Sequence, residues 1–213
     1  MQQQDKVRRF VRSAHEIGLL LLRLISHGLK LSLEDALENY HRVDRRSTGA
    51  FGMLKYPRLS ADSPQLGHSA HMDVGSLTIL FCNVPGLQIR DPKSGKWEYV
   101  QPKEGHAVVN AGDSLRFLTA KRVCSCLHRV VPGPDATIVD RYSLAYFMRP
   151  ELDAVLVDED GEKWRSVEWH ERKYKAFRAT TGEQKKDSVL TGTAGYIGHW
   201  SGYAEVPILA GET

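Results

Sequence analysis

The spacing of hydrophobic and polar residues changes along this chain and predicts two helical parts on either side of an extended part. Residues 5–28 contain no proline and are rich in leucine, which predicts one helix ending near Gly28. A second helix is expected over about 33–42, where Ser32 can cap the first turn and acidic residues follow it. Residues 166–180 return to helical character, with charged and apolar residues interleaved.

Between these helices, short runs of β-branched, leucine and aromatic residues alternate with Gly, Pro, Asn and Asp. The segments PGLQ, DPKSGK, PKEG and NAGD have turn composition, and DPKSGKW reads as a hairpin loop. Regularly spaced strands of this kind are typical of a sandwich or a jelly roll. The runs predict strands near 51–57, 68–74, 77–83, 87–91, 97–100, 106–110, 125–131, 141–149 and 154–158.

The predicted fold is therefore mainly β with flanking helices, as a double-stranded β-helix, or jelly roll. An N-terminal helical segment, 1–50, is expected to pack on a jelly-roll core, 51–160, and a C-terminal helix and irregular tail, 161–213, to follow. With 213 residues, the chain is long enough to bury roughly 70% of its unfolded surface. We expect these parts to form a single domain.

Composition narrows the function classes. The net charge of +3 is too small to indicate nucleic acid or an anionic membrane as a partner. The apolar run 17–25 contains Arg23 and is too short to cross a bilayer, which takes about 20 residues. It therefore predicts a buried helix. The N-terminus lacks the apolar core of a signal peptide. An odd number of cysteines, Cys82, Cys124 and Cys126, favours a reducing, cytoplasmic compartment over a disulfide framework.

Three polar residues form a candidate metal site. His71 and Asp73 are two positions apart, so on an extended backbone both side chains point to one face. His128 lies on a later predicted strand that a jelly roll can bring alongside them. Two histidines and one carboxylate, with the opposite face open, suit non-haem Fe(II).

Each of these residues, taken alone, also has a more common interpretation. A single HxD pair most often lies on the protein surface without a functional role, and a histidine in CLHRVV is more often a hydrogen-bonded core residue. His68 could compete as a ligand, although its opposite strand parity argues against that. Cys124, Cys126 and His128 share one strand face and would suit zinc, but no second cysteine pair follows, so buried thiols are favoured.

A second candidate site lies on the predicted strand DRYSLAYF. Arg141, Ser143, Ala145 and Phe147 alternate along it and therefore share a face. A guanidinium can bind a carboxylate through two parallel hydrogen bonds, the serine adds a third donor, and the phenylalanine can contact an apolar substrate. An ordinary ion pair is the alternative interpretation of the arginine. Tyr56, just before a proline, supplies a phenol that indicates nothing by itself.

Taken together, the ordered motifs resemble the catalytic core of the iron(II)- and 2-oxoglutarate-dependent dioxygenases. The branch that includes isopenicillin N synthase is the most similar, and the sequence resembles its fungal members, which are often tied to secondary metabolism. The KWRSVEWHERKY segment and Tyr56–Pro57 match the family pattern more loosely. The motifs that carry the resemblance, within about 67–150, are HxD, GLQIRDP, VNAGD, LHRV and RYS.

The resemblance implies a role for each candidate residue. His71, Asp73 and His128 would bind iron. Arg141 and Ser143 would bind the far carboxylate of 2-oxoglutarate, with a hydrogen bond from Tyr56, and Phe147 would contact substrate. The implied reaction uses dioxygen to oxidise a small organic molecule by hydroxylation, desaturation or ring closure, with succinate and carbon dioxide as co-products and ascorbate as a candidate reductant. The presence of Asp73 argues against halogenation.

The chain departs from the family pattern in two places. Leu54 stands where plant relatives carry an asparagine. Family members also have a further N-terminal segment that walls the substrate cavity, so we expect a more open site here or one completed by another subunit. The apolar helix face of 17–25 suggests a homodimer.

Two other functions remain open. One is an oxidase of the same fold that needs no 2-oxoglutarate, in which Arg141 and Ser143 hold the substrate's own carboxylate. The other is a truncated jelly roll that binds a metal or a small acid without catalysis.

Overall fold

The computed structural model describes residues 2–58, 67–133, 139–158, 160–184, 186 and 188–192. Two four-stranded antiparallel sheets form its centre, and consecutive strands pass repeatedly from one sheet to the other. The first has the order β1 (Ala50–Tyr56), β8 (Arg141–Met148), β3 (Leu77–Cys82), β6 (Val108–Ala111). The second has the order β2 (His68–His71), β7 (His128–Val130), β4 (Leu87–Arg90), β5 (Trp97–Tyr99). The predicted jelly roll is confirmed.

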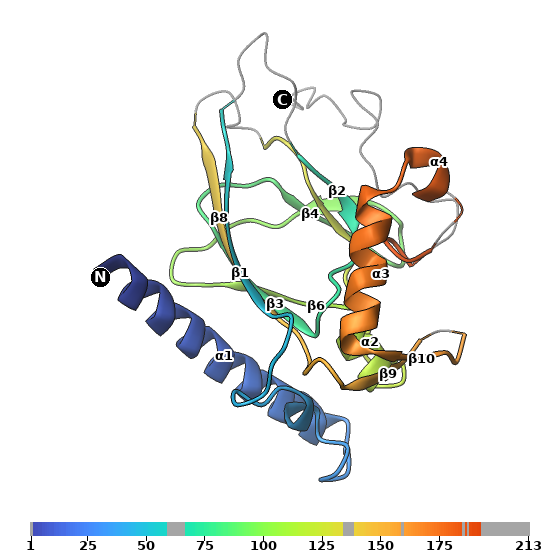
Figure 1. Cartoon of the computed structure of the whole chain (residues 1–213). Coiled ribbons are helices and arrows are strands. Elements are labelled where there is room, and N and C mark those ends of the chain that lie inside the picture. The colour runs from blue at the N-terminus through green and yellow to red at the C-terminus, as the bar shows by residue number, and fades with distance from the viewer. Residues whose placement is uncertain are drawn as a thin grey trace.

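Helices cover the outside of this double sheet (Figure 1). The long helix α1 (Gln2–Gly28) runs along the outer face of the first sheet, and α3 (Ser166–Arg178) stands at one side, near β2. Short elements complete the described part: η1 (Leu37–Tyr40), α2 (Asp113–Leu118), α4 (Thr181–Gln184) and the hairpin of β9 (Val155–Val157) and β10 (Lys163–Arg165). In the part of the chain described, no helix has the length and apolar character needed to span a bilayer.

Strand β8 separates the packed core from the interior of the jelly roll. Its Tyr146 and Met148 belong to a buried cluster with Ala14 and Leu22 of α1. The alternate residues, Arg141 to Phe147, line a cavity between the sheets. Because side chains alternate along a strand, one element serves both packing and the cavity.

A second buried cluster joins α2, β9 and α3. Phe117 packs edge-to-face on Trp169, with ring centroids 4.9 Å apart, and Leu156 lies in the same cluster. This cluster holds α3 beside the interior of the sheets.

The predicted helix over 33–42 is wrong, since only the single 3-10 turn η1 forms there. The Ser32 hydroxyl accepts a hydrogen bond from the Asp35 backbone N–H, 3.1 Å away, and donates to the Asp35 carboxylate at 2.6 Å. Asn39 donates to the Leu33 carbonyl at 2.8 Å. The Ser32 contact has the form of the expected cap, but the Asn39 side chain takes the Leu33 carbonyl, which in a helix would accept from a backbone N–H.

Further differences concern strand ends and short elements. The strand predicted over 68–74 ends earlier, at His71. The strand predicted over 125–131 begins later, at His128. The predicted turn NAGD leads directly into α2, and β10 lies outside the predicted strands. The run 17–25 is only partly buried, because Ile17, Leu20 and Leu24 are 51%, 54% and 59% exposed. Most of the predicted irregular tail, from 193 onward, lies outside the described residues.

Candidate metal centre and anion pocket

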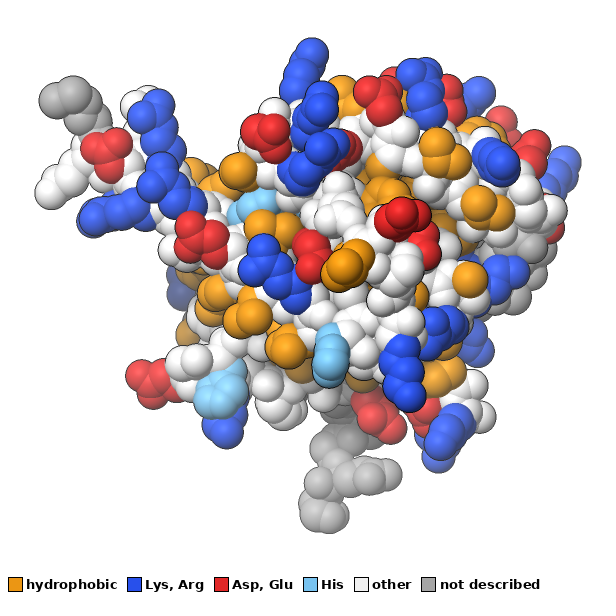
Figure 2. Space-filling model, turned by 90° about the horizontal axis from the view of Figure 1, so that it is seen from below, with side chains coloured by type: hydrophobic (Ala, Val, Ile, Leu, Met, Phe, Trp, Pro, Cys, Tyr) orange, Lys and Arg blue, Asp and Glu red, His pale blue; other side chains and the backbone are white. Residues whose placement is uncertain are grey.

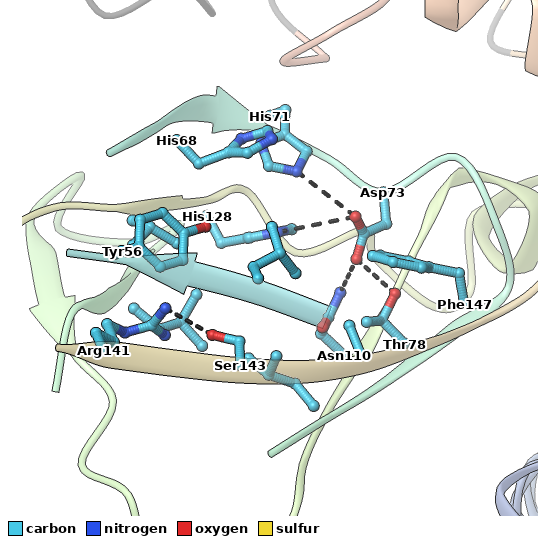
Figure 3. Close-up of a pocket in the computed structure, with 15 residues that line it drawn as sticks. Tyr56, His68, His71, Asp73, Thr78, Asn110, His128, Arg141, Ser143 and Phe147 are labelled. Carbon is cyan, nitrogen blue, oxygen red and sulfur yellow. Dashed lines mark hydrogen bonds and ion pairs between the residues drawn. The ribbon is translucent and has the colours of Figure 1, made fainter. Parts of the chain in front are cut away.

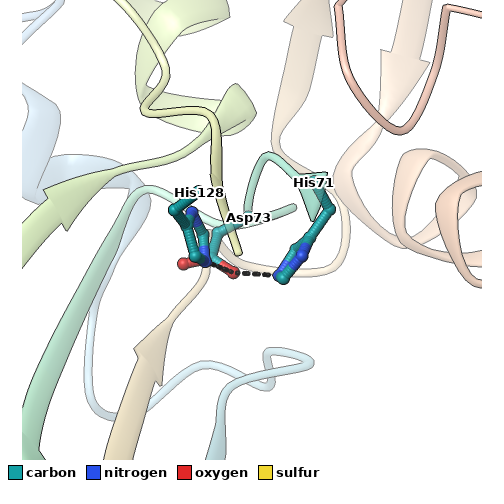
Figure 4. A group of neighbouring side chains, drawn as sticks. All are labelled: His71, Asp73 and His128. Atoms are coloured by element: carbon teal, nitrogen blue, oxygen red, sulfur yellow. Dashed lines mark ion pairs between the residues drawn. The ribbon is translucent and has the colours of Figure 1, made fainter. Parts of the chain in front are cut away.

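Three candidate ligands converge from two strands and a turn (Figures 3 and 4). His71 ends β2 and is paired across the sheet with His128, which begins β7, and Asp73 lies in the turn after β2. The Nε2 atoms of the two histidines lie 3.6 and 3.8 Å from Oδ1 of Asp73. One ligand atom from each residue lies within 4.8 Å of the others, and all three residues are nearly buried.

Backbone carbonyls set the tautomer of both histidines. Nδ1 of His71 lies 2.7 Å from the Ser69 carbonyl oxygen, and Nδ1 of His128 lies 2.9 Å from the Cys126 carbonyl oxygen. A carbonyl only accepts, so each Nδ1–H must donate. The Nε2 lone pair of each ring is therefore free to bind a metal on the side of Asp73.

The two oxygens of Asp73 have different surroundings. Oδ2 accepts hydrogen bonds from Thr78 Oγ1 at 2.6 Å and Asn110 Nδ2 at 2.8 Å. Oδ1 faces the two imidazoles instead. This arrangement orients the carboxylate and leaves one oxygen for an ion.

Electrostatics favour the protonation states that metal binding requires. Burial, followed by the neighbouring His128, lowers the pKa of His71 to about 4, which keeps its imidazole neutral. Burial alone would raise the pKa of Asp73. His128, His71 and the Thr78 hydrogen bond together outweigh burial and hold this pKa well below its usual range. Two imidazoles and one carboxylate on one side of an open cavity form the facial donor set suited to Fe(II).

Arg141 lies at the other end of the same cavity (Figure 3). Its Nη1 donates to Ser143 Oγ at 2.7 Å, and its guanidinium lies 5.1 Å from the centre of the Tyr56 ring. Its Nε and Nη2 are buried and have no hydrogen-bond partner among the described residues. Because unpaired buried donors are costly, this guanidinium is suited to a bound anion such as a carboxylate.

Gly86 provides the space that Arg141 occupies. A Cβ at this position would lie 2.7 Å from Arg141 Nε, and the backbone φ of +150° is one that other residues rarely adopt. The glycine of the GLQIR segment therefore supports the anion pocket.

The structure places every predicted site residue on one cavity. Leu54 lines it as well, so the position of the plant asparagine is an apolar wall here. Among the described residues, no cysteine joins the group of possible ligands, which argues against the zinc alternative. The predicted residues on this cavity are Tyr56, His71, Asp73, His128, Arg141, Ser143 and Phe147.

Three further residues belong to the site, although the sequence pattern does not predict them. Thr78 and Asn110 are polar residues within the apolar strands LTILFC and VVNA, and that contrast is the available signal. Strand parity argues against His68, but the pairing of β2 with β7 is irregular between His68 and His71. This irregularity brings His68 onto the same cavity, with its ring 4.4 Å from that of His71, so the assumption that it faces the other way is wrong. Among the described residues, the group of possible ligands still leaves His68 out, as predicted.

Known proteins share this sequence pattern. Residues 34–150 match the model of the 2OG-Fe(II) oxygenase superfamily. The 2-oxoglutarate-dependent dioxygenase iboH of Amanita muscaria is 44% identical over 186 residues, which cover 86% of this chain and 90% of that protein. The 2-oxoglutarate-dependent dioxygenase frbH of a Dothideomycetidae species is 38% identical over 184 residues, which cover 86% of this chain but only 57% of that protein.

A solved structure shares the fold. A full-length protein of Neurospora crassa, solved in complex with alpha-KG, superposes with a TM-score of 0.67 at 23% identity, and the match covers 83% of this chain and 58% of that one. The chain thus spans most of one curated relative and less than two thirds of the other relative and of this structure. From its motifs, its fold and these matches, the chain belongs to the 2OG-Fe(II) oxygenase superfamily.

Proposed function

We propose that this protein is a non-haem Fe(II)- and 2-oxoglutarate-dependent oxygenase that oxidises a small organic molecule. One observation carries the proposal: a single cavity has three metal donors at one end and, at the other, a buried arginine with two nitrogens that have no partner among the described residues. A metal with open positions and an anion anchor are the two features that a chelating dicarboxylate co-substrate requires.

Each residue has a defined task in this proposal. His71, Asp73 and His128 hold Fe(II), and the backbone carbonyls keep both Nε2 lone pairs directed at it. Arg141 and Ser143 bind the far carboxylate of 2-oxoglutarate, beside the Tyr56 phenol. When bound, the iron, 2-oxoglutarate and dioxygen supply an oxidative decarboxylation that is coupled to oxidation of a substrate C–H bond. The protein contributes by orientation and by excluding water.

The cavity wall indicates the chemical character of the substrate. Beside the metal donors it is formed largely by apolar side chains, so a modest apolar molecule fits better than a sugar or a nucleotide. Phe147 is the substrate-facing aromatic in this proposal. Use of 2-oxoglutarate agrees with the names of the fungal relatives, which are called 2-oxoglutarate-dependent dioxygenases. Hydroxylation, desaturation or cyclisation in secondary metabolism is part of the proposal. The apolar members of the wall are Leu54, Leu80, Leu87, Val130, Ala145 and Phe147.

An anaerobic titration tests the proposal. Metal-free protein receives Fe(II) and then 2-oxoglutarate without oxygen, and a visible charge-transfer band is expected. His71→Ala and Asp73→Ala should abolish the band, whereas His106→Ala, at an exposed histidine outside the cavity, should leave it unchanged. Iron binding without any band would favour an oxidase that does not use 2-oxoglutarate. A protein that binds no iron would refute the proposal.

We also propose a homodimer in the cytoplasm. On the face where α1 lies, hydrophobic side chains are interspersed with charged ones (Figure 2). Ile17, Leu20 and Leu24 of α1 follow helical spacing and are each about half exposed, which supports an apolar contact between two copies. Light scattering on Leu20→Glu and wild-type protein tests this: the dimer should dissociate in the variant, and a monomeric wild type contradicts it.

A further inference from the structure

Helix α3 carries a lysine that is completely buried. Lys173 has no exposed surface, and its Nζ forms an ion pair with Asp113, which is 1% exposed and begins α2. A buried ion pair is seldom more stable than two apolar residues of similar volume, because desolvating both charges offsets their attraction. The pair therefore calls for an explanation other than stability.

The backbone around Asp113 supports the turn that carries Asp73. The Asp113 N–H donates to the Asp73 carbonyl at 2.8 Å, and Ser114 donates to the Gly75 carbonyl at 3.0 Å. A side chain at Gly112 would collide with the carbonyl oxygens of Gly75 and Asp73, so α2 begins in direct contact with this turn. Movement of Asp113 would shift the carboxylate ligand.

The Asp113 side chain reaches the segment of a second ligand. Its Oδ1 accepts a hydrogen bond from Ser125 Oγ at 2.9 Å. The next residue, Cys126, provides the carbonyl that orients His128, and its own N–H donates to the Ala111 carbonyl at 3.0 Å. Asp113 thus connects the segments that carry Asp73 and His128, the first through its backbone N–H and the second through its carboxylate.

Helix α3 also contacts the third ligand. Phe177, one turn after Lys173, packs edge-to-face on His71 with ring centroids 5.3 Å apart. All three ligands are therefore linked to α3, two of them through the Lys173–Asp113 pair. The described contacts of the neighbouring Arg172 are with Glu162, Trp164 and Trp169, away from the ligands.

We propose that Lys173 is a positioning residue of the metal centre, which acts through Asp113 to fix the separation of Asp73 and His128. The inference rests on the proposed metal site. It assigns to a residue outside the cavity an influence on metal affinity that is exerted through Asp113.

Co(II) titration of metal-free protein, followed by visible absorption and combined with thermal melting, tests the inference. Lys173→Met should lower both the melting temperature and the Co(II) affinity, because it removes the cation at Oδ2 of the buried Asp113 carboxylate and leaves only Arg116, whose Nη2 lies 3.3 Å from Oδ1. The double variant Lys173→Met, Asp113→Leu should recover the melting temperature. It should still bind Co(II) at least about tenfold more weakly, with an altered spectrum, because the connection is lost. Arg172→Met is the matched control and should retain wild-type Co(II) affinity.

Ser125→Ala provides a milder variant that keeps the ion pair. It should leave the melting temperature almost unchanged and weaken Co(II) binding several-fold. The inference is overturned if the double variant and Ser125→Ala both bind Co(II) with wild-type affinity and spectrum. The Lys173–Asp113 pair would then be a structural contact without influence on the metal centre. Absence of Co(II) binding in the wild-type protein would instead refute the metal site itself, and with it the proposed function.

Discussion

The Thr78 hydroxyl donates a 2.6 Å hydrogen bond to the Asp73 oxygen that faces away from the two histidines. This contact, together with Asn110, determines which carboxylate oxygen is left for a metal.

Replacing Thr78 by valine should therefore weaken metal binding by about tenfold, since the loss of a hydrogen bond to a metal ligand typically lowers metal affinity by at least that factor. The variant keeps the shape of the side chain, so the melting temperature of the metal-free protein should change little. Co(II) titration measures the effect. Thr78→Ser retains the hydroxyl and is the control, and equal affinities for the valine and serine variants would contradict the prediction.

Arg141→Met should raise the KM for 2-oxoglutarate by at least about tenfold, because a charge-assisted bidentate contact is lost. The same change removes two buried nitrogens that lack partners among the described residues. The ligand-free variant should therefore be no less stable than the wild type and should gain about 1 kcal/mol. Thermal melting with and without 2-oxoglutarate checks both effects. If 2-oxoglutarate does not raise the melting temperature of the wild-type protein, the assignment of Arg141 to 2-oxoglutarate binding is wrong.

Gly112→Ala should be strongly destabilising, by about 2 kcal/mol or more, because the added Cβ meets backbone oxygens that cannot move independently. Metal affinity should fall as well, since one of those oxygens belongs to Asp73. Urea denaturation and Co(II) titration measure the two effects. Gly182→Ala, where a Cβ meets nothing within 4 Å, is the control and should be nearly neutral.

His41 should make stability depend on pH. Its Nδ1–H donates to the Leu37 carbonyl and its Nε2 accepts from Ser76, each at 2.8 Å. Burial lowers its pKa from 6.5 to about 4. Between these values the unfolded chain binds a proton that the folded protein does not, so stability is fully present above about pH 6.5 and falls as the pH drops toward 4.

The loss attributable to His41 is on the order of 3 kcal/mol. Urea denaturation of metal-free protein at pH 7.5 and pH 5 should show about 2 kcal/mol of this loss, since the rest falls between pH 5 and pH 4. His41→Gln should reduce the difference between the two pH values. An unchanged difference in the variant would exclude His41 as the source.

The alternation of polar and apolar residues is sufficient to predict much of the site. Spacing alone puts Arg141 and Ser143 on one face of a strand, and β8 has that geometry. The proximity of His71 and His128 can be predicted only from the family resemblance, because no local pattern shows that two segments so far apart in sequence pair across a sheet.

The failures have physical causes that a residue pattern does not contain. The parity argument against His68 assumes a regular strand, whereas the irregularity of β2 depends on its partner β7. The helix predicted over 33–42 does not form although Ser32 makes the capping contact, because the Asn39 side chain takes the Leu33 carbonyl. The role of Lys173 depends on tertiary contacts, since an amphipathic helix pattern gives no reason to bury a lysine.

Strand β8 has a consequence for how such a protein can diversify. Its Tyr146 and Met148 belong to the core with α1, whereas Ala145 and Phe147 face the cavity. Substitutions at the cavity positions can reshape the chamber without disturbing the packing beneath α1, so new substrate preferences can evolve at little cost to folding. A library confined to Leu54, Ala145 and Phe147 is the corresponding starting point for engineering.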